Sequence, residues 1–98
     1  MDLRNIINLP NLTIVDVREP YEFAAGHVDG SLNIPLGSVP SRLEEFRKMG
    51  QPIILYCRSG NRSGQATGFL RANGILESYN GGSLEEVEYY LAKAAKAA

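Results

Sequence analysis

Short apolar runs along the chain predict the strands of a sheet. The clearest run, residues 53–56 (IILY), is apolar at every position and therefore suits a central strand that is covered on both faces. The β-branched run at 12–15, which ends at Asp16, predicts another buried strand. Shorter strands are expected at 31–34 and at 75–76.

Segments with helical periodicity lie between these strands and after the last of them. Three of their starts carry a proline or a serine–glutamate capping box, and glycines mark ends. The expected helices run over 20–25, from 38 or 41 to 49, over about 63–73, and from 83 into the Ala/Lys-rich tail. The expected capping boxes are Ser41 with Glu44 and Ser83 with Glu86. The glycine pair at 81–82 predicts a turn before the last helix.

Strands that alternate with helices predict an α/β fold. We expect a three-layer sandwich with a central, mainly parallel sheet flanked by helices. The 98 residues predict a single domain over 1–98, because two separate cores would each be too small. Ligands bind at the carboxyl edge of such sheets, where the polar loop 58–62 follows the central strand.

Composition and charge exclude several classes of function. Ten Lys and Arg against eleven Asp and Glu leave a net charge of −1, so no large basic surface for nucleic acid or anionic lipid is expected. The longest apolar run is far too short to span a bilayer, and the N-terminal MDLRN lacks a secretory signal pattern. We therefore expect a cytoplasmic protein with no nucleic-acid or membrane partner.

Cys57 is the candidate nucleophile, because it ends the central strand directly before the polar loop. The helix after that loop directs free N–H groups and its positive dipole end at the loop. Arg58 and Arg62 add positive charge, while Gly60 and Gly64 allow the backbone to curl tightly. Such surroundings lower the pKa of a thiol. A lone cysteine at the end of a strand is most often a small core residue, but the two arginines favour a reactive one.

Two motifs resemble the rhodanese (sulfurtransferase) family. Residues 16–35 read DVREPYEFAAGHVDGSLNIP, which is similar to the family's DVR…E-F/Y…GHI-x-GA-x-NIP signature, with Val28 and Ser31 as mild variants. Residues 57–63 read CRSGNRS, which is similar to the active-site loop of many single-domain members. The similarity covers about 13–91 and includes the glycine pair. The family commonly has a tryptophan soon after that pair, and this chain has none.

The resemblance implies persulfide chemistry at Cys57. The thiolate would take the sulfane sulfur of thiosulfate or a related small anionic donor, and the persulfide would pass it to cyanide or a thiol. No metal is expected, since one cysteine and one histidine cannot complete a structural zinc site, and no cofactor is implied. The residues expected to bind substrate and stabilise the persulfide are Arg58, Ser59, Gly60, Asn61, Arg62 and Ser63.

Two other functions stay open. Cys57 could belong to a carrier or interaction module that receives sulfur from a sulfur-trafficking protein partner. Phosphatases and arsenate reductases with related folds use a loop that is one residue longer between cysteine and arginine. With the longer loop, the arginine would stand at position 63, which is a serine in this chain. The arginine is instead residue 62. The shorter loop suits a single sulfur atom and favours sulfur transfer.

Four residues of the first motif have structural interpretations. His27 lies in a turn, so we expect a structural role for it rather than a partnership with Cys57. Asp16 and Arg18 flank the end of the first strand and predict a buried or half-buried ion pair. Glu22 is expected to accept hydrogen bonds from the backbone.

Overall fold

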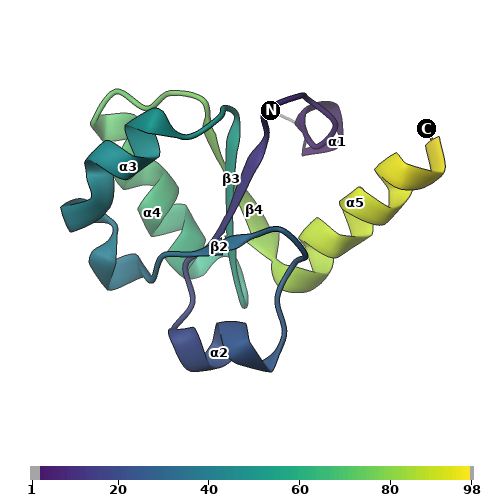
Figure 1. Cartoon of the computed structure of the whole chain (residues 1–98), viewed down its shortest axis with the longest axis horizontal. Helices are drawn as coiled ribbons and strands as arrows, with labels where there is room; N and C mark the ends of the chain where they lie inside the picture. Colours follow the sequence, from purple (N-terminus) through teal and green to yellow (C-terminus); the bar gives the residue numbers. More distant parts are fainter. Residues whose placement is uncertain (1–2, 98) are drawn as a thin grey trace.

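The computed structural model describes residues 3–97 and has the predicted α/β architecture (Figure 1). Within this range the strands form one parallel sheet in the order β2-β1-β3-β4. Residues 1, 2 and 98, on which parts of the secretory-signal and domain predictions fall, lie outside the described range. The strands are β1 (Thr13–Asp16), β2 (Leu32–Asn33), β3 (Ile53–Cys57) and β4 (Ser78–Ser83).

Helices cover both faces of the sheet, which confirms the three-layer arrangement (Figure 1). On one face lie α1 (Leu3–Ile6) and α5 (Leu84–Ala97), and on the other lie α3 (Leu43–Lys48) and α4 (Asn61–Ala72). The short α2 (Pro20–Ala25) lies beyond the carboxyl ends of the strands. None of the helices in residues 3–97 has both the length and the apolar character needed to cross a bilayer.

The strand β3 is buried at every position, and its side chains alternate between two apolar cores. The core shared with α3 and α4 contains Ile53, Leu55 and Cys57, whereas the core shared with α1 and α5 contains Ile54 and Tyr56. This alternation follows from the two-residue period of a strand. The register of β3 therefore places Cys57 on the side of the sheet that α4 covers.

The segment predicted as one helix from 38 or 41 to 49 is broken. Two turns of 3₁₀ helix, Leu36–Ser38 and Pro40–Arg42, come before the short α3. Proline has no backbone N–H and cannot continue the hydrogen-bond ladder of a preceding helical turn. Pro40 therefore starts a new turn, which the apolar periodicity alone does not reveal.

One of the two predicted capping boxes is wrong and the other is confirmed. The Ser41 hydroxyl donates to the Ser38 carbonyl at 3.0 Å, and α3 begins without a side-chain cap. At the start of α5, the Ser83 hydroxyl accepts the Glu86 N–H at 3.1 Å, and the Glu86 carboxylate accepts the Ser83 N–H at 3.0 Å. This box satisfies N–H groups that the first turn of a helix otherwise leaves free.

The last strand begins later than predicted. In the described range no strand forms at 75–76, and β4 begins at Ser78. Ile75 is buried in the core beneath α4, whereas Leu76 is 67% exposed. The apolar pair therefore belongs to the connection between α4 and β4. One of its side chains packs into the core and the other is exposed, a pattern that also suits a short strand.

The glycine pair at 81–82 is part of β4, so the predicted turn is also wrong. Leu55 pairs with Asn80 and Tyr56 pairs with Gly82, so Gly81 is an extra residue that interrupts the register. A Cβ at Gly81 would lie 2.7 Å from a methyl group on β3 and 2.9 Å from one on α5. Glycine is needed there for close packing of α5 on the sheet, not for a turn.

Candidate active site

The loop after β3 and the first turn of α4 contain the predicted site residues. Cys57 ends β3 and has no exposed surface. Arg58 and Ser59 follow it and are both exposed. The N-cap and first turn of α4 are formed by Gly60, Asn61, Arg62 and Ser63.

The helix α4 begins two residues earlier than the predicted start at Ser63. Gly60 adopts a left-handed conformation with φ of 92°, which glycine enters without steric cost. Its carbonyl accepts the Gly64 N–H at 2.9 Å, which is already a helical hydrogen bond. The predicted loop is therefore shorter, and the N-terminal turn of α4 lies directly against Cys57.

The Cys57 Sγ accepts hydrogen bonds from this turn. The Gly60 N–H lies 3.0 Å from Sγ, and the Ser63 hydroxyl oxygen lies 3.4 Å from it. Burial acts most strongly on the pKa of Cys57 and raises it, but the Ser63 hydroxyl and the N–H groups of Ser63, Ser59 and Gly60 together outweigh burial. The pKa of Cys57 is therefore lowered, which favours the thiolate, the nucleophilic form.

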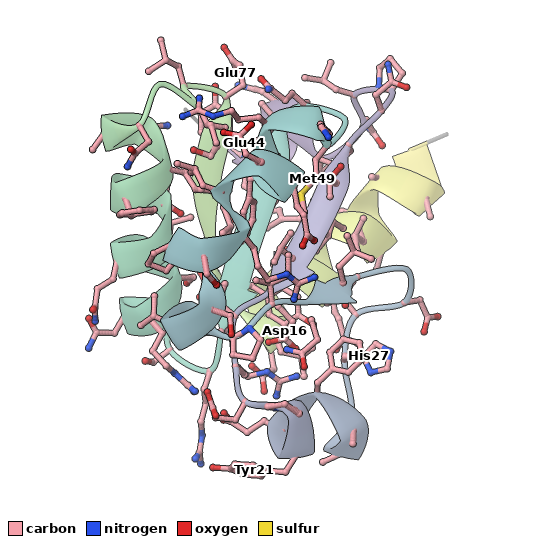
Figure 2. All side chains as sticks on the ribbon, turned by 60° about the vertical axis from the view of Figure 1, so that its left-hand side comes forward. Asp16, Tyr21, His27, Glu44, Met49 and Glu77 are labelled. Carbon is pink, nitrogen blue, oxygen red and sulfur yellow. The ribbon has the colours of Figure 1, made fainter. Side chains whose placement is uncertain are left out.

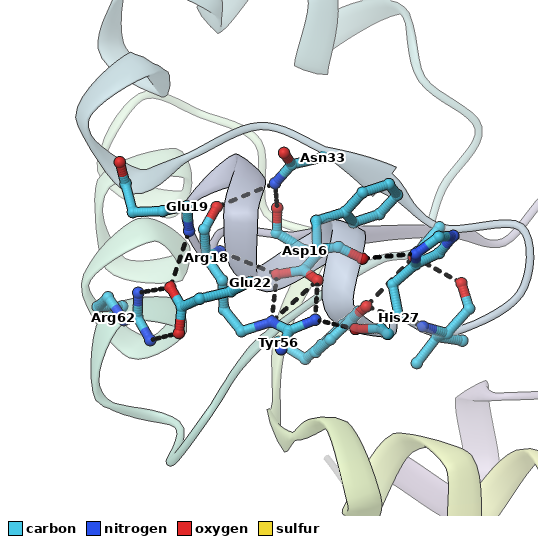
Figure 3. A network of polar contacts seen from close by, with 12 residues as sticks. Asp16, Arg18, Glu19, Glu22, His27, Asn33, Tyr56 and Arg62 are labelled. Atoms are coloured by element: carbon cyan, nitrogen blue, oxygen red, sulfur yellow. Dashed lines mark hydrogen bonds and ion pairs between the residues drawn. The ribbon is translucent and has the colours of Figure 1, made fainter.

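Arg62 is held by Glu22 of α2 (Figure 3). Its guanidinium donates two hydrogen bonds to the Glu22 carboxylate, at 2.7 and 3.1 Å. Glu22 also accepts the Glu19 N–H at 2.9 Å, which confirms the predicted backbone hydrogen bond. These contacts, the Arg62 bond foremost, lower the pKa of Glu22 from 4.5 to about 2. The ion pair joins α2 to the first turn of α4. Because the Glu22 carboxylate neutralises the Arg62 charge, Arg62 is less available to bind an anionic substrate.

We expect Glu22→Gln to lower the free energy of unfolding by about 1 kcal/mol at neutral pH, because the ion pair is only partly exposed. A lowered folded-state pKa contributes stability above the ordinary pKa of 4.5, and this stability is lost as the pH falls through about 2. Urea unfolding at neutral and acidic pH measures both effects. The difference between wild type and variant should shrink in acid.

The exposed pair of Glu44 with Arg47 supplies the control for this prediction, since Glu44 is 78% exposed. Glu44→Gln should change the free energy of unfolding by less than about 0.5 kcal/mol at either pH. A stability gap between wild type and Glu22→Gln that stays constant down to the lowest pH would contradict the assigned ion pair.

The predicted ion pair of Asp16 and Arg18 is confirmed and is buried (Figure 3). The Arg18 Nη2 lies 2.6 Å from Asp16 Oδ2, and the Arg18 backbone N–H donates to Asp16 Oδ1 at 2.9 Å. The same guanidinium donates to the Gly26 carbonyl at 2.7 Å. The pair therefore ties the end of β1 to the residue that follows α2.

A pocket of about 300 Å³ opens beside the Cys57 loop. The Arg58 side chain makes no hydrogen bond or ion pair with the other described residues, so it is available to an anion in the pocket. Tyr21 lies at the outer end of the molecule, on α2 (Figure 2). Cys57 itself has no exposed surface, so the pocket is bounded by the loop that follows it and not by Sγ. The pocket is lined by Arg18, Tyr21, Glu22, Ala25, Arg58, Leu84 and Glu85.

His27 lies on the segment after α2 and is exposed (Figure 2). Its ring stacks on Phe23 with 3.6 Å between ring centroids, and its Nδ1 lies 2.9 Å from the Phe23 carbonyl oxygen. These contacts agree with the expected structural role. None of the contacts found in the described range joins His27 to Cys57.

The family model of the rhodanese-like domain matches residues 1–87. The chain therefore belongs to the rhodanese-like domain family, as its two motifs predicted. The parallel sheet, with the cysteine loop at its carboxyl edge, is the arrangement expected from that resemblance.

Two relatives and one solved structure describe the similarity further. The uncharacterized protein YqhL of Bacillus subtilis is 48% identical over 67 residues, which cover 68% of this chain and 52% of that protein, so this chain spans about half of its length. The thiosulfate sulfurtransferase PspE of Escherichia coli is 34% identical over 74 residues, covering 74% of this chain and 71% of PspE. A solved rhodanese with anions from E. coli matches with a TM-score of 0.70 and 33% identity, covering 76% of this chain and 89% of that chain.

Proposed function

We propose that the protein is a thiosulfate-type sulfurtransferase that carries sulfur as a persulfide on Cys57. The supporting observation is the Cys57 Sγ at the N-terminal turn of α4, where it accepts hydrogen bonds from Gly60 and Ser63. Sulfur transfer needs a thiolate nucleophile, and these contacts favour one. The name of PspE supports thiosulfate as the donor. A reducing cytoplasm would keep Cys57 free of a disulfide between transfers.

The proposed reaction has two substitutions at sulfur. The Cys57 thiolate attacks the outer sulfur of thiosulfate, a new S–S bond forms, and the old S–S bond breaks with its electron pair on sulfite. An acceptor, cyanide or a thiolate, then attacks the terminal sulfur of the persulfide. The Cys57 thiolate leaves, so the enzyme is regenerated without an oxidant, a reductant or a general base.

The same hydrogen bonds support the intermediate. The terminal sulfur of a persulfide is anionic near neutral pH, as is the thiolate that precedes it. Preorganised N–H groups stabilise such charge well in a site that excludes water. The N–H groups of Ser59, Gly60 and Ser63 act on Cys57 at the positive end of the α4 dipole, so they would also stabilise a negative charge on a sulfur atom bound to Cys57.

A panel of substrates tests this function. Transfer from thiosulfate to cyanide or to a thiol should exceed turnover of a generic phosphoester and of arsenate. Faster turnover of either of those two compounds would reverse the assignment. Poor use of thiosulfate, together with persulfide loading from a cysteine desulfurase, would instead favour the sulfur carrier.

We expect Arg58→Ala to raise the KM for thiosulfate about tenfold, because a hydrogen bond to a charged group contributes about 1.5–3 kcal/mol. The kcat should change little, since the Arg58 side chain does not contact Sγ. Steady-state kinetics with thiosulfate and with an uncharged trisulfide measure the effect. Arg47→Ala, which removes an exposed arginine of α3, is the matched control. An unchanged KM for thiosulfate would show that Arg58 is not a donor contact.

A further inference from the structure

The side chain of Asn80 reaches from β4 to the loop that holds Cys57. Its Nδ2 donates to the Gly60 carbonyl at 2.9 Å, and its Oδ1 accepts the Ser63 hydroxyl at 2.7 Å. The same Oδ1 accepts the Gly82 N–H at 3.0 Å. One carboxamide therefore contacts two of the residues whose hydrogen bonds reach the Cys57 Sγ, namely Gly60 and Ser63.

The surroundings of Asn80 fix the orientation of its carboxamide. The Gly60 carbonyl can only accept a hydrogen bond, and the Gly82 N–H can only donate one. Rotation of the carboxamide by half a turn would set oxygen against oxygen and N–H against N–H. The amide oxygen, and not the nitrogen, is therefore presented to Ser63. A Cβ at Gly64 would lie 3.2 Å from Asn80 Nδ2, so the carboxamide also packs closely on α4.

The Ser63 hydroxyl has one proton and two acceptors within reach. Asn80 Oδ1 lies 2.7 Å from the hydroxyl oxygen, and Cys57 Sγ lies 3.4 Å from it. The short bond to Asn80 holds the oxygen beside the sulfur. When Cys57 loses its proton, the negative charge on Sγ draws the Ser63 hydroxyl proton closer to sulfur while its oxygen stays beside Asn80. Asn80 thus sets the place of the Ser63 oxygen beside Sγ, and the one proton can be shared between the two acceptors in a three-centre hydrogen bond.

We propose that Asn80 is a positioning residue that holds the loop so that the Gly60 N–H and the Ser63 hydroxyl converge on Cys57. It does not touch the reacting atoms and acts through those two residues. The expected effect of Asn80 on sulfur transfer rests on the proposed function, but its expected effect on the ionisation of the Cys57 thiol does not. No sequence pattern indicates this role, since Asn80 stands next to glycines that predict only a turn.

The pH dependence of Cys57 alkylation tests the proposal. Cys57 is the only cysteine in the chain, so the mass added by iodoacetamide reports on it alone. The plateau rate reports access to the sulfur, and the midpoint of the pH profile reports the thiolate. We expect Asn80→Ala to raise the midpoint by about one pH unit, because hydrogen bonds that favour the charged form are weakened. Thiosulfate turnover at neutral pH should fall about tenfold in parallel.

Asn73→Ala is the matched control for this variant. The Asn73 carboxamide donates to the Phe69 carbonyl at 2.9 Å, at the far end of α4. Its removal should lower stability without moving the alkylation midpoint. If Asn80→Ala does not fold, as judged by circular dichroism, Asn80→Ser takes its place, and the same upward shift is expected.

An unchanged midpoint in a folded Asn80 variant overturns the inference, even if wild type transfers sulfur. Conversely, a shifted midpoint in a protein that never forms a persulfide supports the role of Asn80 and contradicts only the proposed function. The two claims therefore fail separately.

Discussion

Cys57→Ser is expected to lose sulfur transfer by about a thousandfold or more, while the fold is kept, because the nucleophile itself is removed. Serine fits the site, since its hydroxyl is smaller than the thiol and can still accept from the Gly60 N–H. A hydroxyl does not ionise near neutral pH and cannot hold sulfane sulfur as a persulfide. Thiosulfate turnover, with circular dichroism to verify the fold, measures the loss.

Cys57→Ala separates loss of the nucleophile from any effect of the new hydroxyl. Cys57 lies in the core shared with α3 and α4, so alanine leaves an apolar side chain in apolar surroundings. Both variants should be folded and inactive. Turnover that survives in either folded variant would contradict a reaction through Cys57.

The second large effect concerns stability. Asp16→Asn is expected to lower the free energy of unfolding by about 3–5 kcal/mol, because it leaves the Arg18 charge buried without its counter-ion. Asp16 has no exposed surface, and Arg18 is 8% exposed. A domain of this size is stable by only about 5–15 kcal/mol, so this variant should be marginal. Urea unfolding monitored by circular dichroism measures the change.

A double variant tests the cause of this loss. Asp16→Asn combined with Arg18→Met removes the unpaired charge and should recover part of the lost stability, since replacing a buried pair costs less than breaking it. A double variant that is less stable than Asp16→Asn would contradict the view that the buried charge causes the loss. A single variant that loses less than about 1 kcal/mol would do so as well.

The centre of the fold and the nucleophile were predictable from short-range patterns. The run at 53–56 is apolar at each position because both faces of β3 are covered, and the polar loop after it marks the carboxyl edge of the sheet. The motif that begins at Asp16 contains both members of its buried ion pair, two positions apart. These features depend on neighbours in the chain, so a single sequence reveals them.

The remaining features depend on contacts between distant segments. Glu22 and Arg62 are 40 positions apart, and no local pattern pairs them. Asn80 and Gly60 are 20 positions apart, and they meet only because β4 pairs with β3. Gly81 is required in β4 because α5 packs closely against it. A pair of glycines in the sequence indicates a turn equally well, so the sequence alone does not distinguish the two.

The central claim is that Cys57 carries sulfur, and the intact mass of the protein tests it most directly. After treatment with thiosulfate and removal of excess donor, the protein should gain the mass of one sulfur atom, located at Cys57 by peptide mapping. Addition of cyanide should remove that mass, and Cys57→Ser should never acquire it. A wild-type protein that gains no sulfur from any donor, although iodoacetamide modifies its Cys57, would contradict the account.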